Sequence, residues 1–350
     1  MIKLLKVVVL PMIFFSIVVG VGGTPASKIG RIAGKILLYY LVTTIFAAAC
    51  AVILAQIFKP GLGANLAGTA GAAIEASEAP PVSEVLLNMV PDNIIAAFAQ
   101  GSYLQVLVFA VLVGLAVSFL SDSENERIRE SVKTVLKCCE GASEIMFSVT
   151  RGILEYTPIG VFALISEIFA TQGLSIVGAL GKLIVLCYIG YIFQIIVVYG
   201  GLLSLFSINP IKFYSKAKDF MLMAFATRSS NAVLPVSLRV AEENMGVSRT
   251  VSGFTLPLGA QINMDGEAYY QALSIFFVAN AVGAVLSPAQ WIIMIIAVTI
   301  GTIGTAGVAG AGPVMLLAVM EMLGLSATPG SAVASAFALI LGIDDSVKLL

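Results

Sequence analysis

The chain has 350 residues, of which 59% are hydrophobic and only 11% are charged, whereas about 25% of the residues of a soluble domain are charged. The formal net charge of −1 gives no sign of a nucleic-acid partner, and the absence of histidine excludes a Ser-His-Asp triad and a histidine-ligated zinc site. Apolar stretches without any charge recur, at residues 7–27, 36–58, 93–121, 183–211, 268–320 and 322–343. Each is long enough to cross a bilayer core, which takes about 20 helical residues. The sequence therefore predicts an all-α polytopic protein of the cell (plasma or inner) membrane.

The first half of the chain predicts long helices, at about residues 7–22, 30–58, 95–120, 128–168 and 177–206. No Lys or Arg occurs between Pro60 and Glu126, whereas positive residues gather at 28–35, 127–137 and 212–218. The positive-inside rule places these three clusters in the cytoplasm. The stretch 61–84 then becomes an outside loop.

Four cysteines lie in or beside apolar segments: Cys50, Cys138, Cys139 and Cys187. They lack the paired spacing of a metal site or of a disulfide framework. We expect them to fill the core, as buried free cysteines commonly do.

The second half of the chain repeatedly interrupts apolar sequence with Gly, Pro, Ser, Thr and Asn, at residues 226–235, 257–267 and 301–313. Such backbone is tolerated at membrane depth only where it is buried in protein or lines a cavity. The first and last of these segments predict re-entrant hairpins at about 211–245 and 289–328, and 257–267 predicts a broken helix over 251–286. Paired interruptions are typical of a transporter's binding site, although channel filters also use broken helices.

Asp265 and Glu267 are the only charges between Arg249 and Glu321. Sodium is a hard cation that takes oxygen ligands, by analogy with other hard cations. Asp265 supplies an anion, and we expect unwound backbone over 259–266 to supply carbonyl oxygens.

Three oxygen-bearing side chains lie on one face of the predicted 30–58 helix, because Tyr40 stands three and four residues before Thr43 and Thr44. These side chains are candidate cation ligands. Packing between helices is the alternative role for such residues.

Three motifs occur in this order: "FATRSSNAVLPVSLRVAEENMGVS", "FTLPLGAQINMDGEAYYQALSIFFVANA" and "GTIGTAGVAGAGPVMLLAV". Together they resemble the dicarboxylate/amino acid:cation symporters, the glutamate-transporter-like family, and the resemblance covers essentially the whole chain. It implies a homotrimer with an elevator fold. The scaffold would be about 1–25 and 82–170, and the mobile transport domain about 28–60 and 177–350. By this comparison, the family's first helix would precede Met1 and the end of its last helix would follow Leu350.

The resemblance implies sodium as coupling ion, with no other cofactor. It assigns one sodium site to five residues: Tyr40, Thr43, Thr44, Asn263 and Asp265. It assigns further oxygens, mainly from the main chain of the broken helix and the second hairpin, to Gly259, Gln261, Thr302, Ile303 and Thr305.

For the substrate, the resemblance assigns the α-carboxylate to the two hairpin tips, with Arg228 close by. These tips comprise Ser229, Ser230 and Asn231, and Ala306, Gly307, Val308, Ala309 and Gly310. Backbone N–H groups and helix dipoles favour anions at such places. The serines are equally suited to capping a helix.

Two positions depart from the family pattern. Glu267 stands where acidic-amino-acid transporters carry Thr, and Lys348 stands where they carry an Asp for the substrate's amine. Our hypothesis is that these opposite charges pair beside the substrate and set specificity. The alternative is that Lys348 is misaligned and points elsewhere.

The resemblance and the cation ligands together predict a sodium-driven symporter, in a lipid bilayer, for a small carboxylate solute. Glutamate, aspartate or C4-dicarboxylates are the expected substrates, and a neutral amino acid is the alternative. Gln271 stands where some proton-coupled relatives carry Glu, so that residue offers no proton coupling. An anion-conducting channel, an intramembrane enzyme using Asp265 and Asp344, and an inactive fragment are the alternatives from other classes.

Overall fold

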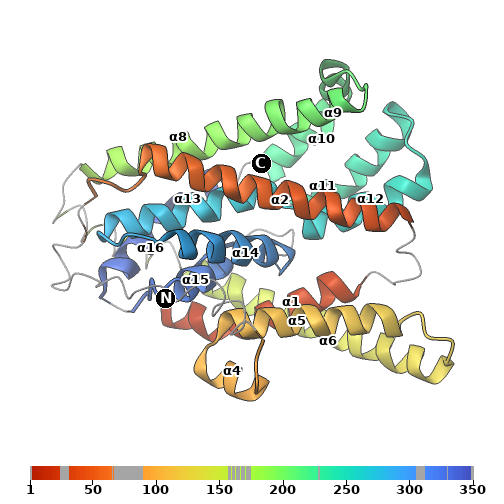
Figure 1. The fold of residues 1–350 in the computed structure, drawn as a ribbon, viewed down its shortest axis with the longest axis horizontal. Coiled ribbons are helices and arrows are strands. Elements are labelled where there is room, and N and C mark those ends of the chain that lie inside the picture. Colours follow the sequence, from red (N-terminus) through yellow and green to blue (C-terminus); the bar gives the residue numbers. More distant parts are fainter. Residues whose placement is uncertain are drawn as a thin grey trace.

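The computed structural model describes residues 2–23, 31–64, 66, 90–156, 159, 162, 166, 170, 175–227, 229–304, 312–328 and 330–347. Within these ranges the regular structure is helical, and Figure 1 shows the helices packed side by side in two groups.

The first group consists of four helices: α1 (Ile2–Gly22), α4 (Ile94–Gln100), α5 (Tyr103–Leu120) and α6 (Glu126–Glu155). Helix α1 packs against both α5 and α6, below the other helices in Figure 1. Glycines let α1 and α5 approach closely, because a Cβ added at Gly114 would lie 2.7 Å from the Cβ of Val21.

The prediction of one helix over 95–120 is wrong in one respect, since the chain breaks between α4 and α5. Gly101 ends α4 in the left-handed conformation, with φ of 73°. Glycine adopts this conformation without steric cost and so commonly stops a helix. Asn93 caps the other end of α4 through bonds from the Ile95 and Ala96 amides.

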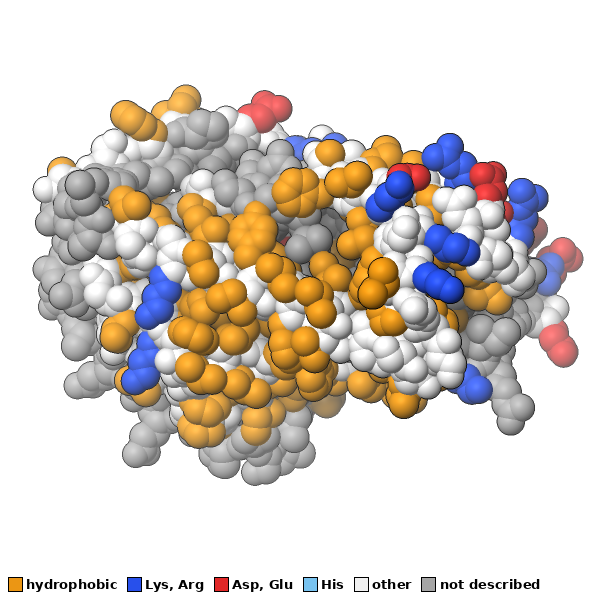
Figure 2. Space-filling model, turned by 90° about the horizontal axis from the view of Figure 1, so that it is seen from above, with side chains coloured by type: hydrophobic (Ala, Val, Ile, Leu, Met, Phe, Trp, Pro, Cys, Tyr) orange, Lys and Arg blue, Asp and Glu red, His pale blue; other side chains and the backbone are white. Residues whose placement is uncertain are grey.

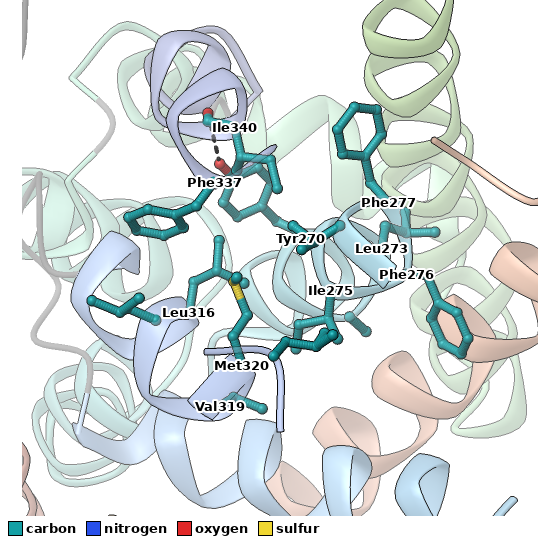
Figure 3. Packing of buried hydrophobic residues seen from close by; sticks show 14 of the residues in the cluster. Tyr270, Leu273, Ile275, Phe276, Phe277, Leu316, Val319, Met320, Phe337 and Ile340 are labelled. Atoms are coloured by element: carbon teal, nitrogen blue, oxygen red, sulfur yellow. Dashed lines mark hydrogen bonds between the residues drawn. The ribbon is translucent and has the colours of Figure 1, made fainter. Parts of the chain in front are cut away.

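Helix α13 (Asp265–Ala281) is the centre of the second group, with 14 of its 17 residues buried. Around it lie α2 (Arg31–Phe58), α8 (Ser175–Phe193), α14 (Pro288–Gly304), α15 (Gly312–Met322) and α16 (Ala332–Val347). Figure 3 shows Tyr270 and Phe277 of α13 in this core with Leu316 of α15 and Phe337 of α16. The Tyr270 hydroxyl is buried and donates to the Ile340 carbonyl oxygen at 3.4 Å.

Helices α2 and α13 are also joined at the far end of α13. Asn280 Nδ2 donates to the Pro60 carbonyl oxygen at 2.7 Å. In the same turn Gly61 has φ of 82°, and a Cβ there would lie 2.2 Å from the Phe277 carbonyl oxygen. Only glycine permits this close approach of the two backbones.

The predicted helix over 177–206 is confirmed, but it is not uniform. Helix α8 continues into a π-helix, η3 (Gln194–Tyr199), and then into α9 (Gly200–Leu205). The Gly200 amide donates to the Ile195 carbonyl oxygen, five residues earlier, as a π-helix requires.

The two predicted hairpin regions contain packed helix pairs. Helix α10 (Pro210–Thr227) lies against α11 (Ser230–Arg239), which continues into the π-helix η4 (Val240–Asn244). Helix α14 lies against α15 in the same way. That these pairs re-enter the membrane stays a prediction.

Apolar side chains cover much of the outer surface. Within the described residues two helices are long and apolar enough to cross a membrane, Gly34–Phe58 and Ile176–Leu205. Figure 2 shows hydrophobic side chains spread over the middle of one face, with most Lys and Arg towards one end. Exposed apolar residues of α2 and α8 include Leu38, Val42, Phe46, Val185, Ile189 and Ile192. Such a broad apolar surface fits contact with lipid.

The expectation for the cysteines is wrong at one position. Cys187 is buried, and Cys50 and Cys139 are partly buried, whereas Cys138 is exposed. The amphipathic helix α6 turns the face that carries Cys138 outward.

Candidate functional site

The chain breaks its helix between α12 (Arg249–Ile262) and α13. Asn263 and Met264 leave the helical conformation, with φ of −120° and −118°. The expectation of unwound backbone over the whole of 259–266 is wrong, because α12 remains helical up to Ile262 and the Asn263 amide still donates to the Gly259 carbonyl oxygen at 3.0 Å. The two-residue break presents Asn263 and Asp265 towards α2.

Helix α2 meets this break with the side chains of Thr43 and Thr44, as expected from the sequence, whereas Tyr40 contributes its carbonyl oxygen and not its side chain. Thr43 Oγ1 and Thr44 Oγ1 lie 3.1 Å and 3.2 Å from the Asn263 side-chain amide. Thr44 Oγ1 also donates to Asp265 Oδ1 at 2.7 Å. The Tyr40 hydroxyl donates to the Thr255 carbonyl oxygen of α12 at 3.0 Å. The structure therefore brings all five residues of the predicted first sodium site together.

The Asn263 amide has two possible orientations at this cluster. One terminal atom lies 3.1–3.3 Å from four oxygens, those of the Tyr40 carbonyl, Thr43, Thr44 and Asp265 Oδ1. With nitrogen turned to them, Asn263 donates to these acceptors, and this orientation satisfies the amide within the protein alone. With oxygen turned to them, five oxygens converge, which is the donor set that a hard cation takes.

Asp265 is 3% exposed and carries three short hydrogen bonds. Thr44 donates to Oδ1, and Gln194 Nε2 and the Tyr199 hydroxyl each donate to Oδ2 at 2.7 Å. None of the ion pairs formed by the described residues involves Asp265. A carboxylate buried this deeply needs a compensating positive charge or a proton.

Gly259 serves the cluster by its lack of a side chain. A Cβ at this position would lie 2.8 Å from the Tyr40 hydroxyl oxygen and 3.1 Å from Cζ of the same ring. Glycine lets the Tyr40 ring cross directly over α12, which fixes the turn of α2 next to the threonines.

Sequence reasoning missed Gln194 and Tyr199. A signal was present, because Gln194 is an amide inside a long apolar run, and polar side chains in such runs are costly and commonly functional. That Gln194 contacts Asp265 could not be predicted without the structure, since nothing in the sequence indicates the π-helix.

The main-chain residues of the predicted second cation site are partly described. Thr302 and Ile303 lie in the last described turn of α14, and Thr302 is buried. The Ile303 carbonyl oxygen would be 3.0 Å from a Cβ at Gly20, so α1 packs directly on this turn. Thr305 and the Gln261 side chain lie outside the described residues.

Among the predicted substrate residues, Ser229 is the N-cap of α11, and its Oγ accepts from the Ala232 amide at 3.3 Å. The capping role weighed from the sequence is therefore present. Ser230 is exposed in the first turn of α11. The remaining tip residues and Lys348 lie outside the part of the chain whose side chains are described, namely Arg228, Asn231, Ala306, Gly307, Val308, Ala309 and Gly310.

Glu267 lies in the first turn of α13, one turn before Gln271, whose Nε2 donates to Glu267 Oε1 at 3.0 Å. A pair between Glu267 and Lys348 stays a prediction, because the position of Lys348 is not described.

Comparison with known proteins decides the family. Residues 1–347 match the family described as "Sodium:dicarboxylate symporter family". The chain belongs to the sodium:dicarboxylate symporter family. This confirms the resemblance drawn from the three motifs, and this family consists of membrane transporters and not of enzymes.

Relatives within the sodium:dicarboxylate symporter family carry two kinds of name. A "Proton/sodium-glutamate symport protein" of Geobacillus stearothermophilus is 32% identical over 331 residues, which cover 92% of this chain and 76% of the relative. The "Proton/glutamate-aspartate symporter" of Escherichia coli (strain K12) is 33% identical, over 93% of this chain and 75% of the relative. A "C4-dicarboxylate transport protein" of Paraburkholderia xenovorans is 32% identical, over 98% and 79%. Transport of carboxylates is therefore the activity that these relatives share by name, and the first two names also state coupling to protons or sodium.

Proposed function

We propose that this protein is a secondary active, sodium-coupled symporter of a small carboxylate solute. The observation that carries the proposal is the oxygen cluster around Asp265. A buried carboxylate, two threonine hydroxyls and the Asn263 side chain meet there, and the hydrogen bonds on Asp265 come from uncharged donors. Such a set suits a sodium ion, which would supply the missing positive charge.

Coupling follows from the position of this cluster at the helix break. Asn263 and Asp265 sit where α12 gives way to α13, and Glu267 lies two residues further along. A cation held at the break fixes the start of α13 and so orders the side chains that would meet the solute. Binding of the cation then favours binding of the solute, and binding of the solute favours binding of the cation to the same extent, as linked equilibria require.

The proposed substrates are acidic amino acids, such as glutamate and aspartate, or C4-dicarboxylates. The names of the relatives support this class. The predicted tip residues 228–231 and 306–310 would hold a carboxylate. Glu267 favours a neutral amino acid as the alternative substrate, because a second negative charge would repel a side-chain carboxylate.

The proposed movement is that of an elevator within a homotrimer. The separation of the helices into two groups supports it, with α1, α4, α5 and α6 as scaffold and the helices around α13 as the moving part. Contacts of α1 with α14 and α15 would form the sliding surface.

Uptake into proteoliposomes tests the function. Purified protein should accumulate radiolabelled glutamate, aspartate or succinate against a gradient when sodium is high outside, and the Asp265→Asn variant should lose this sodium dependence. Asp219→Asn, a matched change at an exposed site of α10, should behave as wild type. Uptake by wild-type protein that follows a pH gradient and ignores sodium would overturn sodium coupling in favour of protons.

A further inference from the structure

The π-helix η3 brings two residues onto one face that an α-helix would separate. Gln194 and Tyr199 are five residues apart and are the first and last residues of η3. Five α-helical residues turn the chain by about 500°, which leaves the two side chains ~140° apart. A π-helix closes its hydrogen bonds between residues i and i+5, so these residues lie nearly above one another.

Both side chains converge on one atom, the Oδ2 of Asp265. Gln194 Nε2 and the Tyr199 hydroxyl donate to it at 2.7 Å each. The other end of the Gln194 amide is also held, because its Oε1 accepts from the Tyr269 hydroxyl at 3.4 Å. This contact fixes which end of the amide faces the carboxylate.

The Tyr269 ring, whose hydroxyl holds Gln194, is itself placed by a glycine of α8. A Cβ at Gly190, one turn earlier on α8, would lie 2.6 Å from Cδ1 of Tyr269. Glycine therefore allows the Tyr269 ring to pack closely against α8, from where its hydroxyl reaches Gln194. Gln194 and Tyr269 are both buried, so water does not compete for these hydrogen bonds.

We infer that Gln194 and Tyr199 are positioning residues for the cation, an inference that rests on the proposed sodium symport. With two donors on Oδ2, the Asp265 carboxylate cannot rotate, and Oδ1 stays directed at Thr44 and Asn263. Neither residue is itself a ligand, since each turns a hydrogen towards the carboxylate. Both are uncharged, so they stabilise the anion and leave its charge for the cation to neutralise.

The sodium dependence of uptake tests this role. Tyr199→Phe removes one hydroxyl at nearly constant volume, and Gln194→Met removes the amide. Each variant should raise the sodium concentration for half-maximal uptake about tenfold, the effect of one hydrogen bond to a charged group. The substrate KM, measured at saturating sodium, should stay within about twofold of wild type, because the change acts through Asp265.

Tyr191→Phe is the matched control, because Tyr191 is a buried tyrosine of α8 that packs on the Tyr269 ring and makes none of the hydrogen bonds described above for Asp265. It should leave the half-saturating sodium concentration unchanged. A Tyr199→Phe protein with wild-type sodium dependence would overturn the inference, as would parallel losses of sodium affinity, substrate affinity and thermal stability. Wild-type uptake that does not depend on sodium would overturn the proposed function instead, so the two failures are distinct.

Discussion

Lys6 of α1 and Glu321 of α15 form an ion pair across the two helix groups, with 2.6 Å between Nζ and Oε1. Glu321 also accepts from Ser326 Oγ at 2.7 Å and from the Ala327 amide at 3.0 Å. Glu321 therefore links α15 to α1, and it also stabilises the turn that follows α15.

The two roles of Glu321 can be separated by substitution. Lys6→Met removes the ion pair alone and should lower the free energy of unfolding by about 1 kcal/mol, as expected for a partly exposed pair. Glu321→Ala also removes two hydrogen bonds and should cost about 2–3 kcal/mol. Thermal unfolding in detergent measures both.

A charge swap provides the decisive comparison for this pair. Lys6→Glu with Glu321→Lys should recover part of the stability that Lys6→Glu alone loses. Arg151 and Glu144 are the control pair, since they stand 3.9 Å apart with both side chains more than half exposed, and their swap should show no coupling. Equal coupling in the two pairs would contradict a specific link between α1 and α15.

Gly259→Ala should weaken sodium binding. The new Cβ would displace the Tyr40 ring and strain its bond to Thr255, and the Tyr40 carbonyl oxygen belongs to the oxygen cluster. We expect the sodium concentration for half-maximal uptake to rise at least tenfold. Gly253→Ala, on the same helix, places its Cβ in open space and should be neutral or stabilising by up to about 1 kcal/mol. Similar sodium dependence in the two variants would show that the Tyr40 contact is unimportant.

Glu267→Thr should shift substrate preference towards dicarboxylates. Removing a negative charge one turn before Gln271 relieves repulsion of a second substrate carboxylate, and we expect the ratio of kcat/KM for aspartate over alanine to rise about tenfold. Glu243→Gln, at an exposed position of η4, removes a charge elsewhere and should leave this ratio unchanged. An unaltered ratio in Glu267→Thr would place Glu267 away from the solute.

Glu242, which links η4 to α12, should make the thermal stability of the protein depend on pH. Hydrogen bonds from Ser252 Oγ at 2.7 Å and Arg249 Nε at 3.2 Å lower the pKa of Glu242 below its ordinary value. The contribution of ionised Glu242 to the free energy of unfolding is therefore complete above the pKa of an unfolded Glu, about 4.3. This contribution is lost as the pH falls through the lower pKa that Glu242 has in the folded protein. The melting temperature of Glu242→Gln should lie below that of wild type at pH 7, and the difference should shrink below pH ~4. A difference in melting temperature that does not change with pH would show that the ionisation of Glu242 does not stabilise the protein.

Much of the fold could be predicted because apolar runs and helix breakers are local signals. Helices α1, α2 and α8–α9 lie close to their predicted bounds. The break at Gly101 was missed, since a single glycine inside an apolar run also occurs in continuous helices, as Gly114 does in α5. The two cases differ in backbone conformation, since Gly101 has φ of 73° whereas Gly114 lies within the regular helix α5.

The cation cluster was predictable only in part. Thr43, Thr44 and Asp265 could be grouped by the spacing of α2 and by the resemblance, and they do meet. Gln194 and Tyr199 could not, because ordinary helical spacing puts them on different faces. The π-helix η3 also has a partner far away in the sequence, because the Tyr214 hydroxyl of α10 donates to the Ile195 carbonyl oxygen.

Helices α2 and α13 are joined near both ends of α13. The Asn280 side chain donates to the Pro60 carbonyl oxygen at one end, and Thr44 donates to Asp265 at the other. Parting these two helices would break both links at once. Helices α2 and α13 should therefore move as one rigid unit, so that Thr44 and Asp265 keep their relative positions throughout the proposed movement.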